Sequence, residues 1–161
     1  MTALPVSVIL DNLRSAYNVG SFFRTADAGG VGRLYLCGIT ASPPHRGISK
    51  TALGSEERVP WERPADTSVL VGELRARGFE IAAVETSLHA IDLFDWKPRF
   101  PVSLVFGNEK DGIGPEISAL CDINIRIPML GMKHSLNVAT AAGVVIYELL
   151  RKYRELQVRA V

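Results

Sequence analysis

The sequence predicts an α/β domain built around a parallel β-sheet. Short apolar runs alternate along the chain with segments of helical periodicity, which is the order typical of parallel strands joined by crossover helices. Residues 101–107 (PVSLVFG) are almost continuously apolar, as expected for a strand that is covered on both faces. A chain of 161 residues can bury one good core, so we expect residues 1–161 to form a single domain.

The first half of the chain contains two expected strands and two expected helices. PVSVIL (5–10) is apolar and β-branched and is expected to be a strand. VGSFFRTADAGG (19–30) has helical spacing and ends in two glycines that stop a helix, and RLYLCGI (33–39) is the next strand. Residues 41–65 are expected to be mostly loop, with a short helix at ISKTALGS (48–55).

The second half continues the alternation and ends in a long helix. Its elements are expected at 68–78 (helix), 79–86 (strand), 101–107 (strand), 115–121 (helix), 123–129 (strand) and 135–154 (helix). Gly78 stops the first of these helices, and Pro115 stands at the first position of the second. Ser135 is expected to cap the closing helix.

Composition and charge exclude several classes of protein. There is no leader-like N-terminus and no uncharged apolar run of 18 residues, so we expect neither secretion nor a membrane span. Cys37 and Cys121 lie in apolar, strand-like runs and are expected to be buried reduced thiols in a cytoplasmic protein. The net charge of +1 neither demands nor excludes a nucleic-acid partner. The basic tail, which has interspersed acids, is expected to be a solvated helix end, comprising Arg151, Lys152, Arg154 and Arg159.

Three segments are expected to converge on one site. In open parallel sheets, ligands bind outside the carboxyl ends of the strands. The segments that follow three of the expected strands hold most of the clustered glycines, asparagines and charges, and they are residues 11–30, 107–116 and 128–137. We therefore expect the site at this edge of the sheet.

Common nucleotide and hydrolase motifs are absent from the sequence. Gly112-Ile-Gly114 lacks the third glycine of a dinucleotide fingerprint, and GNEKDG lacks the Lys and Ser/Thr that complete a phosphate loop. There is no HExxH, CxxC or GxSxG, and the three histidines are scattered, so no metal is expected. The site should therefore consist of backbone groups and small polar side chains.

Two places in the sequence support a site made of backbone and small polar groups. They are the glycine after the strand at 101–106 and the start of the closing helix. Gly107 would let a ligand approach main-chain groups, although it can also serve only to make a turn. Ser135 and Asn137 can likewise serve only as helix caps. The very small residues at 139–143 (ATAAG) indicate that another backbone comes close to this helix.

The three segments together resemble the ordered motifs of the SpoU (TrmH-like) branch of the SPOUT RNA methyltransferases. The matching stretches are 18–29 (NVGSFFRTADAG), 104–113 (LVFGNEKDGI) and 127–138 (IPMLGMKHSLNV), and the resemblance extends over about residues 5–152. It implies a parallel-sheet SPOUT fold whose C-terminal part, about residues 100–152, forms a trefoil knot. It also implies a homodimer that uses S-adenosylmethionine to methylate a ribose 2′-hydroxyl in tRNA or rRNA.

The same resemblance places the cofactor in the knot, with its adenine in an apolar slot. Main-chain groups of the knot loops would hydrogen-bond the adenine edge, and Thr86 would close the pocket near the ribose. Carbonyl-rich loops suit a positively charged sulfonium. The residues expected to bind the cofactor are Thr86, Gly107, Ile127, Met129, Ser135 and Leu136.

Arg24 is the key catalytic residue that the resemblance implies. Because a guanidinium has a pKa above about 12, it is better suited to gripping an RNA phosphate and the 2′-hydroxyl than to acting as a free base. Asn18 is expected to position the helix of Arg24 or the substrate, and Glu109 and Asn137 to orient Arg24 or the ribose. Glu109 can instead fix a loop, and Asn12 can form a turn.

Arg24, Arg46 and Lys50 are the expected RNA-binding residues, with a solvated loop as an equal alternative for Arg46 and Lys50. The first strand begins at about residue 5, so no separate RNA-binding domain is expected. Recognition would then fall to the surface of a dimer, in which one protomer's Arg24 completes the site of its partner, or to another protein. The sequence does not name the RNA or the methylated nucleotide.

Two other interpretations remain open. A non-catalytic RNA-binding or cofactor-sensing dimer could have the same fold, but the presence of Arg24, Glu109 and Asn137 argues against it. A nucleotide-dependent enzyme of another kind, such as a nicotinamide oxidoreductase, is disfavoured by the missing glycine fingerprint.

Overall fold

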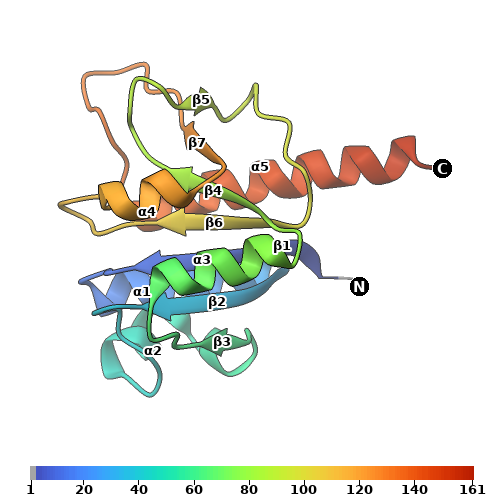
Figure 1. Cartoon of the computed structure of the whole chain (residues 1–161). Coiled ribbons are helices and arrows are strands. Elements are labelled where there is room, and N and C mark those ends of the chain that lie inside the picture. Colours follow the sequence, from blue (N-terminus) through green and yellow to red (C-terminus); the bar gives the residue numbers. More distant parts are fainter. Residues whose placement is uncertain (1–2) are drawn as a thin grey trace.

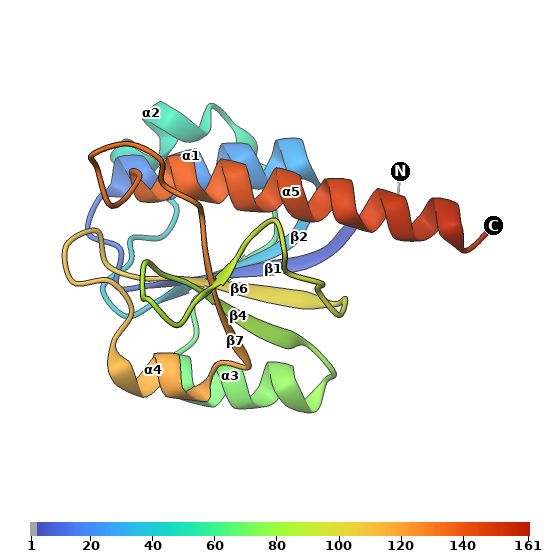
Figure 2. The same cartoon turned by 90° about the horizontal axis from the view of Figure 1, so that it is seen from above.

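The computed structural model describes residues 3–161 and has one β-sheet between two layers of helices (Figures 1 and 2). The described residues form a seven-stranded sheet in the order β3-β2-β1-β6-β4-β7-β5, with every neighbouring pair parallel. The strands are β1 (Leu4–Asp11), β2 (Val31–Cys37), β3 (Trp61–Glu62), β4 (Glu80–Val84), β5 (Ile91–Asp92), β6 (Val102–Phe106) and β7 (Ile123–Arg126). The helices are α1 (Ala16–Gly29), α2 (Arg46–Ala52), the 3-10 turn η1 (Ser55–Glu57), α3 (Thr67–Ala76), α4 (Pro115–Leu120) and α5 (Val138–Arg159). The predicted parallel α/β class is confirmed.

The sheet separates two hydrophobic cores. Val8 and Leu10 of β1 belong to the core that contains α1 and α5, whereas Ile9 belongs to the core that contains α3. This alternation follows from the period of two in an extended strand. Figure 2 shows the result, with α1, α2 and α5 over one face of the sheet and α3 and α4 over the other. Within the described part of the chain, no helix is long and apolar enough to cross a bilayer.

The start of α5 corrects the predicted helix cap. Asn137, and not Ser135, is the N-cap, because its Oδ1 accepts hydrogen bonds from the N–H groups of Ala139 at 2.9 Å and Thr140 at 3.3 Å. Ser135 lies in the exposed loop before the cap. A short polar side chain that accepts from the second and third helical N–H groups is the usual way to begin a helix, and both residues were candidates for that role.

Other boundaries differ in smaller ways. The two-residue strands β3 and β5 were not predicted, because so short a strand carries no periodicity. The helix expected at 48–55 is α2, which ends where Leu53 adopts a left-handed conformation with φ of 54°. Cys37 is buried in β2 as expected, but Cys121 follows α4 and is only half-buried, so its placement in a strand was wrong. Both thiols are free.

The expectation of a solvated helix end is wrong for Lys152. Its side chain is buried, and Nζ donates hydrogen bonds to the carbonyl oxygens of Leu93 and Trp96, both at 2.5 Å. These bonds tie α5 to the loop after β5. Arg151 behaves as predicted for an exposed helix face and pairs with Glu148 and Glu155.

Two glycines of α1 lie close to neighbouring helices, Gly20 to the backbone of α2 and Gly29 to a side chain of α5. A Cβ added at Gly20 would lie 2.3 Å from the carbonyl oxygen of Ile48 in α2, and one at Gly29 would lie 2.7 Å from Ile146 of α5. A Cβ added at Gly143 would meet nothing within 4 Å. Gly143 therefore has no neighbouring backbone within residues 3–161, whereas Ala142, one residue earlier, is fully buried in the core that α5 shares with α1.

Candidate functional site

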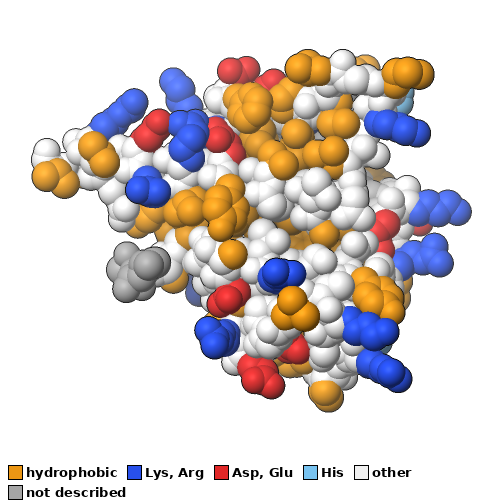
Figure 3. Space-filling model, turned by 180° about the vertical axis from the view of Figure 1, so that it is seen from behind, with side chains coloured by type: hydrophobic (Ala, Val, Ile, Leu, Met, Phe, Trp, Pro, Cys, Tyr) orange, Lys and Arg blue, Asp and Glu red, His pale blue; other side chains and the backbone are white. Residues whose placement is uncertain are grey.

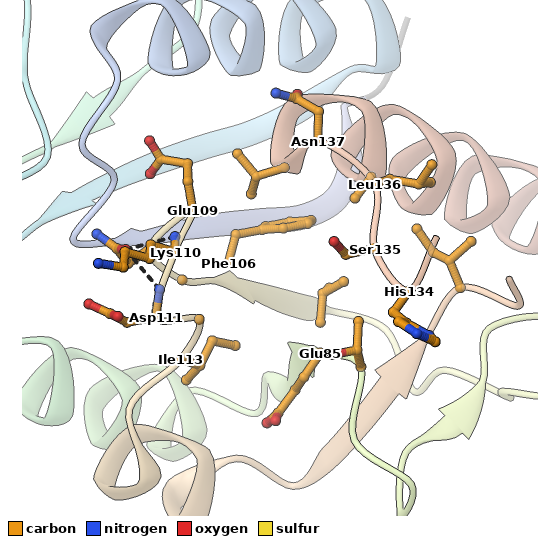
Figure 4. A pocket seen from close by; sticks show the side chains of 18 of the residues that line it. Glu85, Phe106, Glu109, Lys110, Asp111, Ile113, His134, Ser135, Leu136 and Asn137 are labelled. Atoms are coloured by element: carbon orange, nitrogen blue, oxygen red, sulfur yellow. Dashed lines mark hydrogen bonds between the residues drawn. The ribbon is translucent and has the colours of Figure 1, made fainter. Parts of the chain in front are cut away.

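A cavity of about 670 Å³ lies at the carboxyl ends of β4, β6 and β7. Its walls come from the segment after β4, the segment after β6, and the loop that leads from β7 into α5 (Figure 4). Parallel strands deliver their following loops to the same edge of the sheet, which is why segments far apart in the sequence meet here. Two of the three predicted segments thus line one cavity.

The residues predicted to bind a cofactor all line this cavity. They are Thr86, Gly107, Ile127, Met129, Ser135 and Leu136. The apolar residues Phe106, Ile113 and Val138 also line the cavity. The walls mix polar and apolar side chains in similar proportion, and a concave site of this size is typical of small-molecule binding.

The segment directly after β4 forms a polar wall that the sequence analysis missed. Glu85 lies across the cavity from Leu136 and Asn137 (Figure 4), and its Oε1 accepts a hydrogen bond from the hydroxyl of Ser118 in α4 at 2.7 Å. Ser87 also lines the cavity, and its Oγ is the buried side-chain oxygen or nitrogen that lacks a hydrogen-bond partner among the described residues. The sequence signal that could have identified Glu85 and Ser87 was their position beside Thr86, directly after a buried strand.

Gly107 is required by its own loop. A Cβ there would lie 2.4 Å from the carbonyl carbon and oxygen of Gly112 and 2.5 Å from the nitrogen of Ile113. The loop folds back because Asn108 and Gly112 exchange backbone hydrogen bonds of 3.1 and 2.9 Å, and Gly112 has a φ of 69°. The main chain that comes close to Gly107 is therefore that of its own loop, as the turn interpretation held.

Glu109 joins this loop to the segment between β1 and α1. Its two carboxylate oxygens accept hydrogen bonds from the backbone N–H groups of Arg14 at 2.8 Å and Ser15 at 2.9 Å. Asn108 Nδ2 donates to the carbonyl oxygen of Asn12 at 2.9 Å. Asn12 itself has a φ of 60°, and its Oδ1 accepts from the N–H of Ile39. The loop-fixing role of Glu109 and the turn-forming role of Asn12 are both observed.

Asn18 reaches the cavity through Asn137. Asn137 Nδ2 donates to Asn18 Oδ1 at 3.5 Å, so the first turn of α1 lies against the start of α5. The first predicted segment, residues 11–30, therefore joins the site through hydrogen bonds rather than by lining the cavity.

Arg24 lies apart from these residues. It is six residues further along α1 than Asn18, about 9 Å along the axis, and its side chain is exposed. Within residues 3–161 its guanidinium makes no hydrogen bond or ion pair, and it does not line the cavity. Its neighbours Phe22, Phe23 and Ala26 face the core, whereas Arg24 faces solvent.

Arg46 and Lys50 lie on α2, outside the cavity. Both are exposed and line a separate hollow between the first turn of α1 and the start of α2. Glu109 and Asn137 thus line the cavity and Asn18 contacts Asn137, while Arg24, Arg46 and Lys50 lie outside the cavity.

Neither thiol is set up as a nucleophile. Burial raises the pKa of Cys37 to about 11 and that of Cys121 to about 12, so both thiols are protonated near neutral pH. Among residues 3–161 there is no group of three or more His, Cys, Asp or Glu side chains that could hold a metal ion.

The sheet order and the cavity at its carboxyl edge define a class of parallel α/β protein with a ligand-sized cavity between three loops. Within that class, the chain belongs to the SpoU rRNA methylase family, whose model matches residues 5–147. A Staphylococcus epidermidis protein named as a member of the TrmH family of tRNA/rRNA methyltransferases is 35% identical over 150 residues. The match covers 93% of this chain and 60% of that protein, so the chain spans about 60% of the length of this relative.

Solved structures of related proteins share the fold. The TrmH/SpoU tRNA modifying enzyme of A. aeolicus has a TM-score of 0.87 and 32% identity, and the match covers 97% of this chain and 79% of that one. The SpoU methyltransferase AviRb from Streptomyces viridochromogenes, solved with the cofactor AdoMet, has a TM-score of 0.85 and 29% identity over 92% of this chain and 60% of that one. A structure described as giving insight into the 2-OH methylation of C/U34 on tRNA has a TM-score of 0.81 and 27% identity, over 93% of this chain and 97% of that one.

Proposed function

We propose that the chain is an S-adenosylmethionine-dependent RNA methyltransferase that acts on a ribose 2′-hydroxyl in tRNA or rRNA. The observation that carries the proposal is the meeting of all six predicted cofactor residues in one cavity at the carboxyl edge of the sheet. Membership of the SpoU rRNA methylase family and the relatives named as tRNA/rRNA methyltransferases support the same activity. The AdoMet complex of AviRb supports the choice of cofactor.

The cavity suits the cofactor in size and in the chemistry of its walls. Phe106, Ile127 and Leu136 offer apolar surface for a flat base. The segment after β4 offers the Glu85 carboxylate and the partnerless hydroxyl of Ser87, which suit the hydroxyl and amino groups of the cofactor's polar part. Three carboxylates and one lysine line the cavity, and this balance favours a cation.

The proposed role of the chain's residues is to orient the ribose. Its 2′-oxygen would form a bond to the methyl carbon as the carbon–sulfur bond breaks, and the hydroxyl proton would pass to water. When bound, S-adenosylmethionine supplies a methyl group on a positively charged sulfur. The rest of the cofactor leaves as a neutral thioether, so the leaving group needs no general acid. Asn137 and Asn18 would position the start of α5 and the ribose beside the cavity. The Arg24 guanidinium would grip an RNA phosphate and the 2′-hydroxyl together, which keeps the hydroxyl oriented for attack.

We further propose that the protein acts as a homodimer in which Arg24 completes the partner's site. Arg24 is exposed and lies outside the cavity of its own chain, so it can serve a second copy. Helix α5 also exposes the apolar side chains of Val144, Tyr147 and Leu156. Hydrophobic side chains gather in orange patches on the face that Figure 3 shows. The open space around Gly143 would then receive the backbone of the partner. Light scattering that shows a monomer at micromolar concentration would contradict this arrangement.

The remaining proposals concern the chain path and its setting. We propose a single SpoU-type domain over residues 1–161, a trefoil knot within about residues 100–152, and a cytoplasmic location. The loop that leads from β7 to α5 and the loop after β4 line the same cavity, which supports a path in which one passes the other closely. A structure determined by crystallography would test the knot directly.

Methyl transfer tests the activity. The protein and the Arg24→Ala variant would be incubated with radiolabelled S-adenosylmethionine and undermodified total RNA, and the labelled nucleoside would then be identified. Arg77→Ala, an exposed arginine after α3 on the other face of the sheet, is the matched control. We expect label in a 2′-O-methylribose that is lost in Arg24→Ala and kept in Arg77→Ala. Label in a base would contradict the 2′-hydroxyl reaction, and no label with intact cofactor binding would favour the non-catalytic dimer.

A further inference from the structure

A second hollow, of about 660 Å³, lies between the first turn of α1 and the start of α2. Its walls are formed by Ser15, Ala16, Tyr17, His45, Arg46, Gly47 and Lys50. We propose that this hollow binds an unpaired nucleotide of the substrate RNA, which stacks on Tyr17, a few nucleotides or fewer from the ribose that is methylated. The inference rests on the proposed function, and it specifies a single-stranded region as the substrate.

Tyr17 supplies the aromatic surface. Its side chain is 53% exposed, so the ring is open to a ligand that enters the hollow. A base stacks on such a ring whatever its identity, since every base has a π-face. His45 lies in the same hollow, and its Nδ1 accepts a hydrogen bond from the N–H of Gly47 at 3.0 Å. That bond holds the imidazole in one orientation and leaves its other nitrogen able to donate to a base or a phosphate.

The two helices that carry these residues are held rigidly together. Thr51 Oγ1 of α2 donates to the carbonyl oxygen of Tyr17 at 2.7 Å. A Cβ at Gly20 would lie 2.0 Å from Thr51 Oγ1, so the helices touch where a side chain would separate them. Tyr17 is therefore presented on a fixed platform, which lowers the entropy lost when a ligand binds.

The charge of the hollow fits a phosphate backbone. Arg46 and Lys50 are exposed and form no ion pair within residues 3–161, and no carboxylate belongs to the walls. Free cations beside an exposed aromatic ring are the combination that grips single-stranded nucleic acid. Figure 3 shows several Lys and Arg side chains along the right-hand edge of this face, which is the edge where the strands end.

A continuous path leads from this hollow to the cofactor cavity. A small hollow lined by Arg14, Ser15, Glu109 and Lys110 lies between them. It shares Ser15 with the Tyr17 hollow and shares Glu109 and Lys110 with the cavity. An RNA strand with its reactive ribose at the cavity can thus run past Arg14 and Lys110 and place a neighbouring base on Tyr17. In a duplex the base faces are covered by stacking, so only an unpaired strand offers a base to this ring.

Binding measurements with the full chain test the inference. Fluorescence anisotropy would compare a short labelled single-stranded RNA with the same strand annealed to its complement, over a series of salt concentrations. We expect tighter binding of the single strand and about a tenfold loss of its affinity in Tyr17→Ala, from the usual size of one stacking contact. Tyr17→Phe should bind like the unaltered chain, because it keeps the ring. Arg46→Ala and Lys50→Ala should each reduce the salt slope by about 1, whereas Tyr17→Ala should leave that slope unchanged.

The controls separate this inference from the proposed function. Phe94→Ala removes another exposed aromatic ring, outside the hollow, and should leave RNA binding unchanged. Tyr17→Leu provides a second non-aromatic variant, and the melting temperature of each variant would show that it is folded. Wild-type affinity in both Tyr17→Ala and Tyr17→Leu, or equally tight binding of the duplex, would overturn the inference. If the Tyr17 inference fails, calorimetry with S-adenosylmethionine shows whether the proposed function fails with it. Cofactor binding by the unaltered chain would leave the proposed function standing, whereas absence of both cofactor and RNA binding would overturn it as well.

Discussion

The side-chain amide of Asn137 donates to the side-chain oxygen of Asn18 at 3.5 Å, and this contact joins the start of α5 to the first turn of α1. The same Asn137 side chain caps α5 through its Oδ1. One residue thus holds together two segments of the proposed site that are far apart in the sequence, and its two roles can be separated by mutation.

Asn137→Ala should remove both roles, and Asn137→Asp only the contact with Asn18. A carboxylate oxygen still accepts from the first helical N–H groups, but it offers no donor to Asn18. We expect Asn137→Ala to lower the free energy of unfolding by about 1 kcal/mol, the usual cost of losing a cap, and Asn137→Asp to lower it much less. Both variants should reduce methyl transfer. Urea denaturation provides the stabilities, and equal stability of Asn137→Ala and the unaltered chain would contradict the capping role.

Gly107→Ala should disrupt the loop after β6. The new Cβ would lie 2.4 Å from the backbone of Gly112, and backbone at that distance cannot yield as a flexible side chain can. We expect a loss of several kcal/mol in stability, together with loss of S-adenosylmethionine binding measured by calorimetry. Gly131→Ala is the matched control, because a Cβ there meets nothing within 4 Å. Normal cofactor binding by Gly107→Ala would show that the loop can be remodelled without affecting the cavity.

Glu85→Gln should weaken cofactor binding while the fold is retained. The glutamine can still accept the hydrogen bond from Ser118, but it lacks the charge that strengthens a hydrogen bond to a ligand. A difference of about 1 kcal/mol between charged and neutral hydrogen bonds corresponds to roughly a fivefold loss of affinity for S-adenosylmethionine. Glu116→Gln changes an exposed acid of α4 outside the cavity and should have no effect. Indistinguishable titrations of the two variants would remove Glu85 from the polar wall of the proposed site.

Cys37 should make the protein less stable at alkaline pH. Burial, opposed by a hydrogen bond with Thr67, raises the thiol pKa from 9.0 to about 11. The folded chain therefore holds this proton between about pH 9 and 11 while the unfolded chain releases it, so the free energy of unfolding falls as pH rises through that range. Cys37→Ala removes this contribution, and its stability should decline less steeply with pH. Urea denaturation of both proteins at several pH values measures the two slopes, and parallel curves would contradict the assignment.

Much of the fold was predictable, because local sequence patterns determine where many of its strands and helices begin and end. The apolar run at 101–107 and the glycine stops after 28 and at 78 determine a strand and two helix ends through backbone conformation alone. The loops that line the cavity were predictable from the ordered motifs together with the rule that parallel strands deliver their following loops to one edge of the sheet. The two-residue strands β3 and β5 were not predictable, because so short a strand has no periodicity. The choice between Ser135 and Asn137 as a cap was not predictable either, because both side chains can accept from helical N–H groups.

The sequence by itself determined the parallel α/β class, the family resemblance and the set of loops that would meet. Only the tertiary structure decided what each polar side chain touches. Glu109 binds two backbone N–H groups of a distant loop, Lys152 is buried against two carbonyl oxygens, and Arg24 lies outside the cavity of its own chain. The physical reason is that hydrogen-bond partners and burial depend on contacts between segments far apart in the chain, whereas strand and helix formation depend largely on neighbours along it.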